Sequence, residues 1–304
     1  MKFGAETNYK QFLALATYFR HHKIVDDLLN MDYFNNRLRK SSTYNKQTVR
    51  KWLFNSWNTE RVLILNTRLL ETDNNYFILQ WSFPQAYYAA FASTLAFFKT
   101  VGYTEESHTS VLRKFGSLVA EDRYPNGISF YCTGTKSNPE YHNIECTAVQ
   151  SALELNIFDY ESVKNKICQF LKTTRKQQLD LKRLENSVKK LFRTKGGQIK
   201  SNLTESDWEK VAEMIGNTSL LNLLYRKRIK ANYQDIDTFN FEGIKSVQIN
   251  RCLNNVVFNI NLTHESMIYK AIGFDDFNSI YQDFCRGRET DFLDKRFEMI
   301  NNSI

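Results

Sequence analysis

Glycine and proline are scarce in this chain, and their scarcity limits the folds open to it more than any other feature. The 304 residues include 11 glycines and 3 prolines, whereas average usage of these two residues together is about 12% of a chain. β-Sandwiches and barrels need a turn about every ten residues, and such turns draw heavily on glycine and proline. We therefore expect a mainly all-α protein, with room for one short β-hairpin.

The composition indicates a cytoplasmic protein without a membrane span. Hydrophobic residues make up 42% of the chain and aromatic residues 14%, which is ample for a packed core. The sequence contains no run of about 18 uncharged apolar residues. Its first residues also lack the apolar region of a signal peptide.

The cysteines indicate reduced thiols. They are five in number and include no Cys-x-x-Cys pair, so neither a disulfide framework nor a zinc ribbon is predicted. One alternative stays open, because Cys132, His142 and Cys146 have a spacing that could supply three ligands to a metal ion. Since no second pair lies nearby and the usual nucleotide and metalloprotease motifs are absent, we expect no metal and no cofactor.

Apolar periodicity and turn residues divide the chain into five predicted parts. In chain order these are an N-terminal helical extension (1–45), the first part of a helical bundle (46–120), an insertion with an irregular loop and a basic helix (121–205), the second part of the bundle (206–273) and a C-terminal helix (274–304). Helices are also expected over 46–70 and 148–152. The β-rich composition of residues 247–262 leaves a hairpin there as an alternative to a helix.

The clearest helix is predicted between Pro84 and Gly102. Pro84 stands where the first turn of a helix tolerates proline, and Gly102 ends the pattern. Aromatic residues alternate with alanines between them, so a neighbouring helix can approach closely. Thr104 or Ser107 can cap the next helix, and the two helices would form a hairpin.

Positive charge is concentrated between Glu161 and Lys200. This segment holds twelve basic and three acidic residues, whereas the whole chain has a net charge of +8, so the remainder carries one net negative charge. Apolar residues recur every three or four positions up to Gly196-Gly197, which predicts one long amphipathic helix, or two in near-continuity. Its basic face is either a solvated surface or a phosphate-binding surface. In the second case the RNA-binding residues are Lys172, Arg175, Lys176, Lys182, Arg183, Lys189, Lys190 and Arg193.

Two separated stretches resemble the HEPN superfamily of helical-bundle proteins. The first runs from Tyr87-Tyr88-Ala89 through Gly102 to Ser107-His108, and it resembles the second and third helices of that family. The second, Arg228-x-x-Ala231-Asn232-Tyr233, is similar to the Arg-x-x-Ala-Asp-Tyr pattern that opens the last bundle helix in one branch. The resemblance implies a four-helix bundle, frequent homodimerisation and, in many members, metal-independent RNA cleavage in toxin–antitoxin or phage-defence systems.

The hallmark of the family is an arginine followed four to six residues later by a histidine, with a tyrosine two residues further in some toxins. Arg226 and Tyr233 match the outer members of this pattern, but Ala231 occupies the histidine position. The chemistry needs a base for the ribose 2′-hydroxyl and a cation for the phosphate. The resemblance therefore implies a catalytic set in which other groups, or a histidine from elsewhere in the fold, take the place of the missing histidine. That catalytic set is Arg226, Arg228, Asn232, Tyr233 and Asp235.

These residues also have structural interpretations. Arg226 and Arg228 can form a solvated basic turn, Tyr233 can be a core residue with a hydrogen-bonded hydroxyl, and His108 can cap or pack a helix. We expect a HEPN-like protein that binds RNA, as a homodimer or in a heteromeric complex, and that is an endoribonuclease if its site is active. The alternative is a catalytically inactive adaptor subunit. A DNA-binding role is third, because the sequence has neither zinc-finger spacing nor a clear helix-turn-helix.

Overall fold

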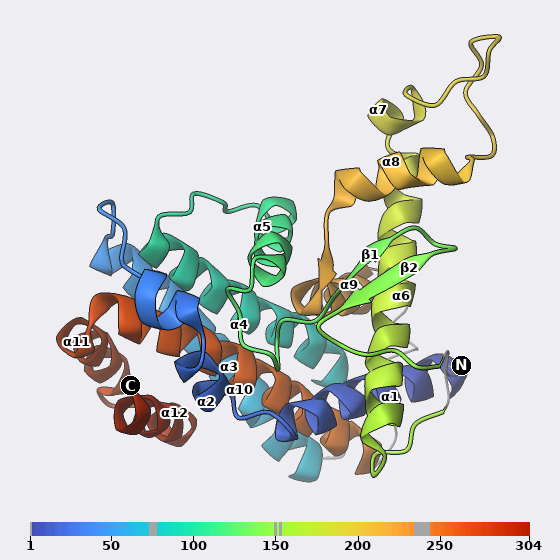
Figure 1. Cartoon of the computed structure of the whole chain (residues 1–304). Helices are drawn as coiled ribbons and strands as arrows, with labels where there is room; N and C mark the ends of the chain where they lie inside the picture. Colours follow the sequence, from blue (N-terminus) through green and yellow to red (C-terminus); the bar gives the residue numbers. More distant parts are fainter. Residues whose placement is uncertain (1, 73–77, 149–150, 152–153, 234–243) are drawn as a thin grey trace.

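Helices dominate the structure, which is a computed structural model that describes residues 2–72, 78–148, 151, 154–233 and 244–304 (Figure 1). The elements are α1 (Lys2–Arg20), α2 (Ile24–Leu29), the π-helical turn η1 (Tyr33–Arg37), α3 (Lys46–Thr72), α4 (Ile78–Val101), α5 (His108–Ala120), β1 (Tyr131–Gly134), β2 (Pro139–His142), α6 (Tyr160–Leu184), α7 (Asn186–Lys189), α8 (Glu205–Ile215), β3 (Thr218–Ser219), α9 (Leu220–Tyr233), α10 (Ile244–Ile272), α11 (Phe274–Cys285) and α12 (Asp291–Ser303). The prediction of a mainly α-helical fold with one short hairpin, β1–β2, is confirmed. None of the described helices combines the length and the apolar character that a membrane span requires.

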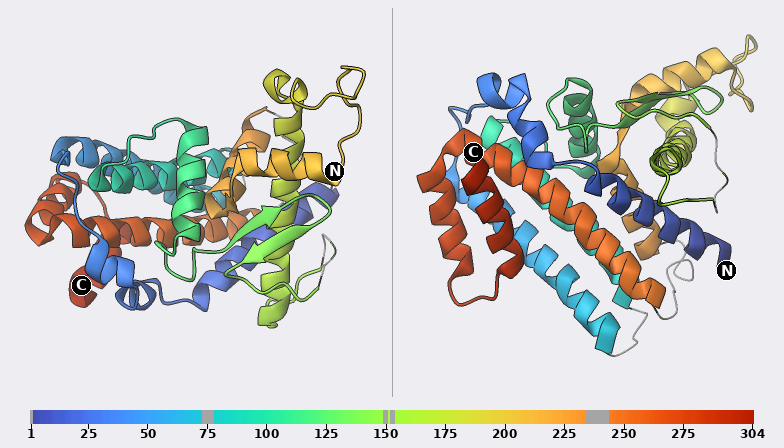
Figure 2. Two further views of the ribbon diagram at one scale, coloured as in Figure 1. Left: turned by 45° about the horizontal axis from the view of Figure 1, so that its top comes forward. Right: turned by 60° about the horizontal axis from the view of Figure 1, so that its bottom comes forward.

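Helix α4 is the centre of the bundle. It packs against α3, α9 and α10 (Figures 1 and 2). Ala86, Ala89 and Ala90 are fully buried on α4, and their small side chains let the neighbouring helices approach closely. Gly102 follows the helix with a φ of +88°, and Ser107 caps α5 with its side chain, as the sequence predicts.

Pro84 lies inside α4, so the prediction that it occupies the first turn is wrong. The helix already begins at Ile78. A proline in a helix interior removes one backbone hydrogen bond and costs about 3 kcal/mol. Leu79 and Phe83 precede the proline and are buried, and burying each such side chain contributes about 2 kcal/mol. Core packing therefore offsets the cost of the proline and extends the helix toward its N-terminus.

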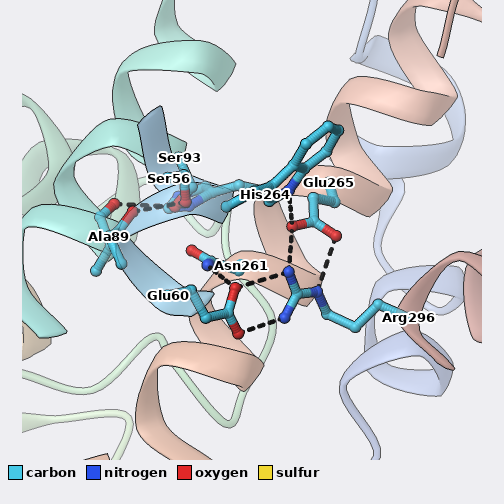
Figure 3. A network of polar contacts seen from close by, with 10 residues as sticks. Ser56, Glu60, Ala89, Ser93, Asn261, His264, Glu265 and Arg296 are labelled. Atoms are coloured by element: carbon cyan, nitrogen blue, oxygen red, sulfur yellow. Dashed lines mark hydrogen bonds and ion pairs between the residues drawn. The ribbon is translucent and has the colours of Figure 1, made fainter. Parts of the chain in front are cut away.

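A buried ion-pair network joins α3, α10 and α12 in the core (Figure 3). Arg296 has no exposed surface and pairs with Glu60 at 2.5 Å and with Glu265 at 2.9 Å. Trp57 donates its indole N–H to Glu265 at 2.8 Å, and Asn261 donates to Glu60 at 2.8 Å. Burial alone lowers the pKa of Arg296, but the two carboxylates raise it above its ordinary value. The network therefore holds a permanently charged arginine in the core and ties α12 to the bundle.

The basic segment forms two helices in near-continuity, which is the second of the two predicted alternatives. Helix α6 ends at Leu184, Glu185 has extended backbone, and the short α7 follows. Gly196-Gly197 does not end a helix but lies in a loop closed by a β-bridge between Arg193 and Ile199. Figures 1 and 2 show α7 and this loop projecting beyond the end of α6.

A second, small hydrophobic core explains why the chain turns back after α6. Leu179 of α6, Val188 of α7 and Val211 of α8 are buried together in this core. A capping box at Thr204 opens α8, which brings Val211 into position. Packing of α8 against the end of α6 is therefore more favourable than continuing α6 as a longer helix.

The other predicted segments differ in how well they agree with the structure. Residues 247–262 lie within α10, so helix and not hairpin is correct there. The predicted C-terminal helix is two helices, α11 and α12, and Gly287 has a φ of +70° in the turn between them. In segment 148–152, residues 148 and 151 are not helical and the others lie outside the described residues. The predicted helix over 46–70 is confirmed as α3, whereas the five-part division of the chain stays a prediction.

The small sheet separates the residues that could have formed a metal site. Strand β1 pairs antiparallel with β2 and β3, and its register sets Tyr131 opposite His142 and Cys132 opposite Tyr141. Neighbouring residues of a strand point to opposite faces, so Cys132 faces the core while His142 stacks on Tyr131 with the ring centroids 4.5 Å apart. The set of Cys132, His142 and Cys146 is therefore not assembled, and the described part of the chain holds no group of three His, Cys, Asp or Glu side chains suited to a metal.

Candidate functional site

Helix α9 directs three consecutive cations toward three different neighbours. Arg226 reaches α6, Lys227 reaches α1, and Arg228 reaches α4. Successive residues of an α-helix are rotated by about 100°, so a basic triplet surrounded by other helices must distribute its charges in this way. Arg226 and Arg228 therefore do not share one site, which corrects the expectation that both belong to a single catalytic set. The alternative of a solvated basic turn is also wrong, since all three side chains make contacts within the protein.

Arg228 lies among tyrosines of α4 and α9. Its Nη2 donates to the hydroxyl of Tyr88 at 2.6 Å. The guanidinium carbon is 5.1 Å from the ring centroid of Tyr88, 5.9 Å from that of Tyr87 and 5.7 Å from that of Tyr225. Each distance is within the range of a cation–π contact. Aromatic faces and one hydroxyl therefore hold this cation, and no carboxylate of the described residues contacts it.

His108, at the start of α5, shares two of these tyrosines with Arg228. Its Nδ1 is 2.8 Å from the hydroxyl of Tyr87, and its ring centroid is 5.8 Å from that of Tyr225. Burial and the charge of Arg228 lower the pKa of His108 below its ordinary value, so the imidazole is neutral at pH 7. The cap of α5 is Ser107, so His108 packs and does not cap.

We call Arg228, His108, Tyr87, Tyr88 and Tyr225 the Arg228 cluster. It joins a cation, a neutral imidazole and three phenols from α4, α5 and α9. Such a group can bind an anion and can move a proton. The family-like stretches already contained Arg228 and His108, but the sequence interpretation treated His108 as structural. Only the packing of α5 against α4 and α9 brings the two residues to the same tyrosines.

Lys227 is buried without an acidic partner among the residues described. Its Nζ donates to Gln11 of α1 at 2.7 Å, donates also to Asn8, and lies 4.8 Å from the ring centroid of Phe170. Burial, with smaller contributions from neighbouring cations, lowers its pKa well below the ordinary value. This lysine therefore holds α9 on α1 through neutral hydrogen-bond acceptors, and it is a residue that the sequence interpretation did not single out.

Arg226 faces α6 and not the Arg228 cluster. Its Nη1 donates to the hydroxyls of Thr173 at 2.8 Å and Thr174 at 3.0 Å. Burial lowers its pKa to about 10. Its Nε is buried and has no hydrogen-bond partner among the residues described. Arg226 is thus a second, separate cation site on the opposite side of α9.

The remaining residues of the predicted catalytic set are dispersed. Tyr233 ends α9 with 71% of its surface exposed, so its interpretation as a core residue is wrong. Asn232 lies one helical turn beyond Arg228, and its Oδ1 is buried without a partner. Ala231, at the family's histidine position, is fully buried. Asp235 lies outside the described residues.

The predicted phosphate-binding surface loses one residue. Arg175 is buried and donates to the carbonyl oxygens of Gly134 at 2.6 Å and Gly216 at 2.8 Å, and also contacts Cys132 and Thr218. It therefore joins α6 to the sheet, and its assignment to the outer face is wrong. Helical periodicity could not reveal this, because the sheet that covers this side of α6 comes from a distant part of the chain.

The other basic residues of the segment reach the surface to different degrees. Lys182 pairs with Glu185 at 2.7 Å, and Arg183 donates to the carbonyl oxygen of Ser201. Four lysines have no ion pair with a described residue, and Arg193 is exposed but bonds to backbone carbonyls nearby. These four are Lys172, Lys176, Lys189 and Lys190. The basic surface thus runs along α6 to α7 and the projecting loop.

Comparisons of this chain with protein-family models, with curated proteins and with solved structures found no match. The function proposed below is accordingly argued from the geometry of the Arg228 cluster, from the basic surface and from the motifs in the sequence.

Proposed function

We propose that this protein is a HEPN-like, RNA-engaging protein that cleaves RNA without a metal, as an endoribonuclease toxin or a phage-defence effector. One observation carries the proposal. Arg228 and His108 both contact Tyr87 and Tyr225, so a cation and a neutral imidazole flank one position. These are the two groups that cleavage through the ribose 2′-hydroxyl requires. The histidine that the sequence motif lacks is then supplied by α5.

The proposed reaction uses groups of the Arg228 cluster only. When Nδ1 of His108 donates to Tyr87, the lone pair of Nε2 is available to take the proton of the 2′-hydroxyl. The 2′-oxygen attacks phosphorus, and Arg228 stabilises the negative charge that develops on the phosphate oxygens. The bond to the 5′-oxygen breaks, and the Tyr88 hydroxyl, whose oxygen accepts from Arg228, donates its proton to that oxygen. The products are a 2′,3′-cyclic phosphate and a free 5′-hydroxyl.

The basic surface supports RNA as the substrate. Lys172 and Lys176 of α6, Lys189 of α7 and Lys190 directly after α7 carry charges that no described acidic residue neutralises. Such lysines bind phosphates without sequence preference and in a salt-dependent manner. RNA held along α6 would add affinity, while the Arg228 cluster would perform the reaction. We propose a homodimer or a heteromeric complex as the working form.

One observation favours the alternative, a catalytically inactive HEPN-like adaptor. Ala231 occupies the family's histidine position and has no exposed surface, and its carbonyl oxygen accepts from Gln80 at 2.8 Å. A histidine at this position would point into the core. In an adaptor the Arg228 cluster would bind a phosphate or a partner without cleaving anything.

Incubation of the purified protein with total RNA at low salt, in the presence of EDTA, tests the two alternatives. We expect cleavage products with 2′,3′-cyclic phosphate ends from the unchanged protein. Replacing Arg228 by Ala should lower the cleavage rate by about 10²- to 10³-fold, and replacing His108 by Gln by about 10²-fold or more. Arg37→Ala is a matched control, because Arg37 is an exposed arginine outside the cluster, and its rate should not change.

The outcomes separate the two functions. Binding of RNA without cleavage by any protein would establish the adaptor and exclude the nuclease. Absence of both binding and cleavage would exclude the nuclease and an adaptor that binds RNA. Cleavage that survives Arg228→Ala and His108→Gln together would show that the active site lies elsewhere. Light scattering of the same samples measures whether one or two copies are present.

A further inference from the structure

A pocket of about 290 Å³ lies between α5, α6, α8 and α9. It is on the Arg226 side of α9, away from Arg228. Apolar side chains form much of its wall, among them Leu112, Met214, Ile215 and Ile229. A pocket of this size suits a small organic molecule, and a mostly apolar wall with a few polar groups is typical of such sites.

Arg226 is a half-buried cation that lines this pocket. Its Nη1 is occupied by Thr173 and Thr174, but within the described chain neither Nε nor Nη2 has a hydrogen-bond partner. The unoccupied edge of the guanidinium, Nε with Nη2, is a fork of two parallel N–H groups, which matches the two oxygens of a carboxylate. A buried cation without an anion is unfavourable, and an anionic ligand would relieve that cost.

The charges around the pocket favour a ligand with a single negative charge. Lys182 and Glu185 line the same pocket and pair with each other at 2.7 Å, so they add no net charge. Arg113 lies on the lining but is exposed to solvent. One desolvated guanidinium therefore faces a largely neutral and apolar wall, which suits a carboxylate better than a phosphate dianion.

Gln177 adds a requirement for a hydrogen-bond donor. Its side chain lines the pocket, and its Oε1 is buried and has no partner among the residues that the structure describes. A hydroxyl or N–H group on the ligand would satisfy this oxygen. A carboxylate for Arg226, a donor for Gln177 and an apolar body between them define the ligand.

We infer that this pocket binds a small organic monocarboxylate that carries a hydrogen-bond donor and an apolar or aromatic body. The ligand places its carboxylate on Nε and Nη2 of Arg226 and its donor on Oε1 of Gln177. Tyr225 lines the pocket and also belongs to the Arg228 cluster, so the occupied pocket adjoins the proposed active site. The inference does not depend on RNA cleavage.

Thermal unfolding and isothermal titration calorimetry with para-hydroxyphenylacetate as the probe test this site. The matched control ligand is tyrosol, in which a CH₂OH group replaces the carboxylate, and a second control is inorganic phosphate. We expect para-hydroxyphenylacetate at about 100 times its Kd to raise the Tm by about 4 °C. Tyrosol and phosphate should leave the Tm unchanged.

Three variants locate the binding. Arg226→Met removes the charge and keeps the length of the side chain, and it should weaken binding of the probe at least tenfold. Gln177→Leu should weaken the binding of para-hydroxyphenylacetate but not the binding of phenylacetate, which lacks the phenolic donor. Arg37→Met is the control and should bind like the unchanged protein.

Several results would overturn the inference. These are no binding of the carboxylate at millimolar concentration, equal binding of tyrosol, and undiminished binding by Arg226→Met. If Arg226→Met fails to fold, the Gln177→Leu comparison decides, because a Gln177 variant that binds both acids as before would place the ligand elsewhere. RNA plays no part in these measurements, so their failure and a failure of the nuclease proposal can be told apart.

Discussion

Two arginines of this protein, the fully buried Arg296 and the half-buried Arg226, have opposite surroundings. Arg296 of α12 is held by the carboxylates of Glu60 and Glu265, with further hydrogen bonds to both acids (Figure 3). Arg226 of α9 is held by two threonine hydroxyls, and its Nε has no partner in the described part of the chain. The carboxylates raise the pKa of Arg296, whereas burial lowers the pKa of Arg226 to about 10. The first site is complete within the chain, and the second lacks an anion.

This difference separates a charge that only stabilises the fold from a charge that can still bind a ligand. A buried cation with paired, hydrogen-bonded carboxylates has no capacity left for a ligand, and removing it leaves uncompensated negative charge. A cation with neutral partners keeps capacity for an anion where one of its N–H groups lacks a partner among the described residues, as Nε of Arg226 does. Arg228, with one tyrosine hydroxyl and three aromatic rings around it, belongs to the second kind.

The largest effect is expected at the complete site. Replacing Arg296 by Met leaves Glu60 and Glu265 buried and unpaired, and such losses cost about 3–5 kcal/mol. We expect a fall of this size in the free energy of unfolding, measured by urea denaturation. Arg226→Met should change the same quantity by less than about 1 kcal/mol in either direction, because it removes a buried charge that has no counter-charge.

A rescue variant sharpens this contrast. Adding Glu60→Gln and Glu265→Gln to Arg296→Met removes both orphaned charges and should restore part of the lost stability. If the two single variants, Arg296→Met and Arg226→Met, lost equal stability, the distinction between complete and incomplete sites would be wrong.

The second effect concerns a buried group whose charged form has no partner at all. His264 lies beside Glu265 in α10, and its two ring nitrogens bond to neutral hydroxyls, Ser93 at 2.9 Å and Tyr124 at 3.0 Å. Burial lowers its pKa to about 3. The unfolded chain therefore binds a proton between about pH 6.5 and pH 3 that the folded chain does not. Stability present above pH 6.5 is lost as the pH falls through this window.

At pH 5 this loss amounts to about 2 kcal/mol relative to pH 7. His264→Gln keeps hydrogen-bonding groups but does not titrate, so its free energy of unfolding should fall by about 2 kcal/mol less over the same range. Denaturation curves at pH 7 and pH 5 measure the difference. Parallel losses in the variant and the unchanged protein would exclude His264 as the cause.

These buried sites also mark the limit of what the sequence predicts. Helical periodicity, the stop at Gly102 and the capping residue Ser107 predicted the mainly helical fold and several boundaries. Periodicity could not place Arg175 in the interior or reveal that Arg226 and Arg228 face different helices. Those facts depend on which distant elements cover each side of a helix, and a single sequence contains no direct record of such contacts.

The third effect concerns the exposed cations of α7 and the projecting loop. Replacing Lys189, Lys190 and Arg193 by Gln removes three charges from α7 and the projecting loop. If this region binds RNA phosphates, affinity at low salt should fall about tenfold or more, and the slope of log K against log salt should fall by about 2, because each contact with single-stranded RNA contributes about 0.7. Filter binding at several salt concentrations measures both quantities.

The control removes the same number of exposed cations from elsewhere, at Lys23, Arg37 and Arg251. This variant has the same net charge, so general electrostatic attraction is matched. Equal losses of affinity in the two variants would mean that α7 and its loop are only part of a diffuse positive field.

The smallest effect is expected at Tyr233, the family-like tyrosine of the sequence motif. Its side chain is 71% exposed at the end of α9, and it lies five residues beyond Arg228, so it does not share the face of α9 that carries Arg228. Tyr233→Phe should change the free energy of unfolding by less than about 0.5 kcal/mol and leave RNA cleavage unchanged. His108→Gln in the same assay provides the contrast. If Tyr233→Phe lowered cleavage as strongly as His108→Gln, then the sequence motif and not the Arg228 cluster would identify the catalytic residues. The distinction between complete and incomplete cation sites would then not predict where the active site lies.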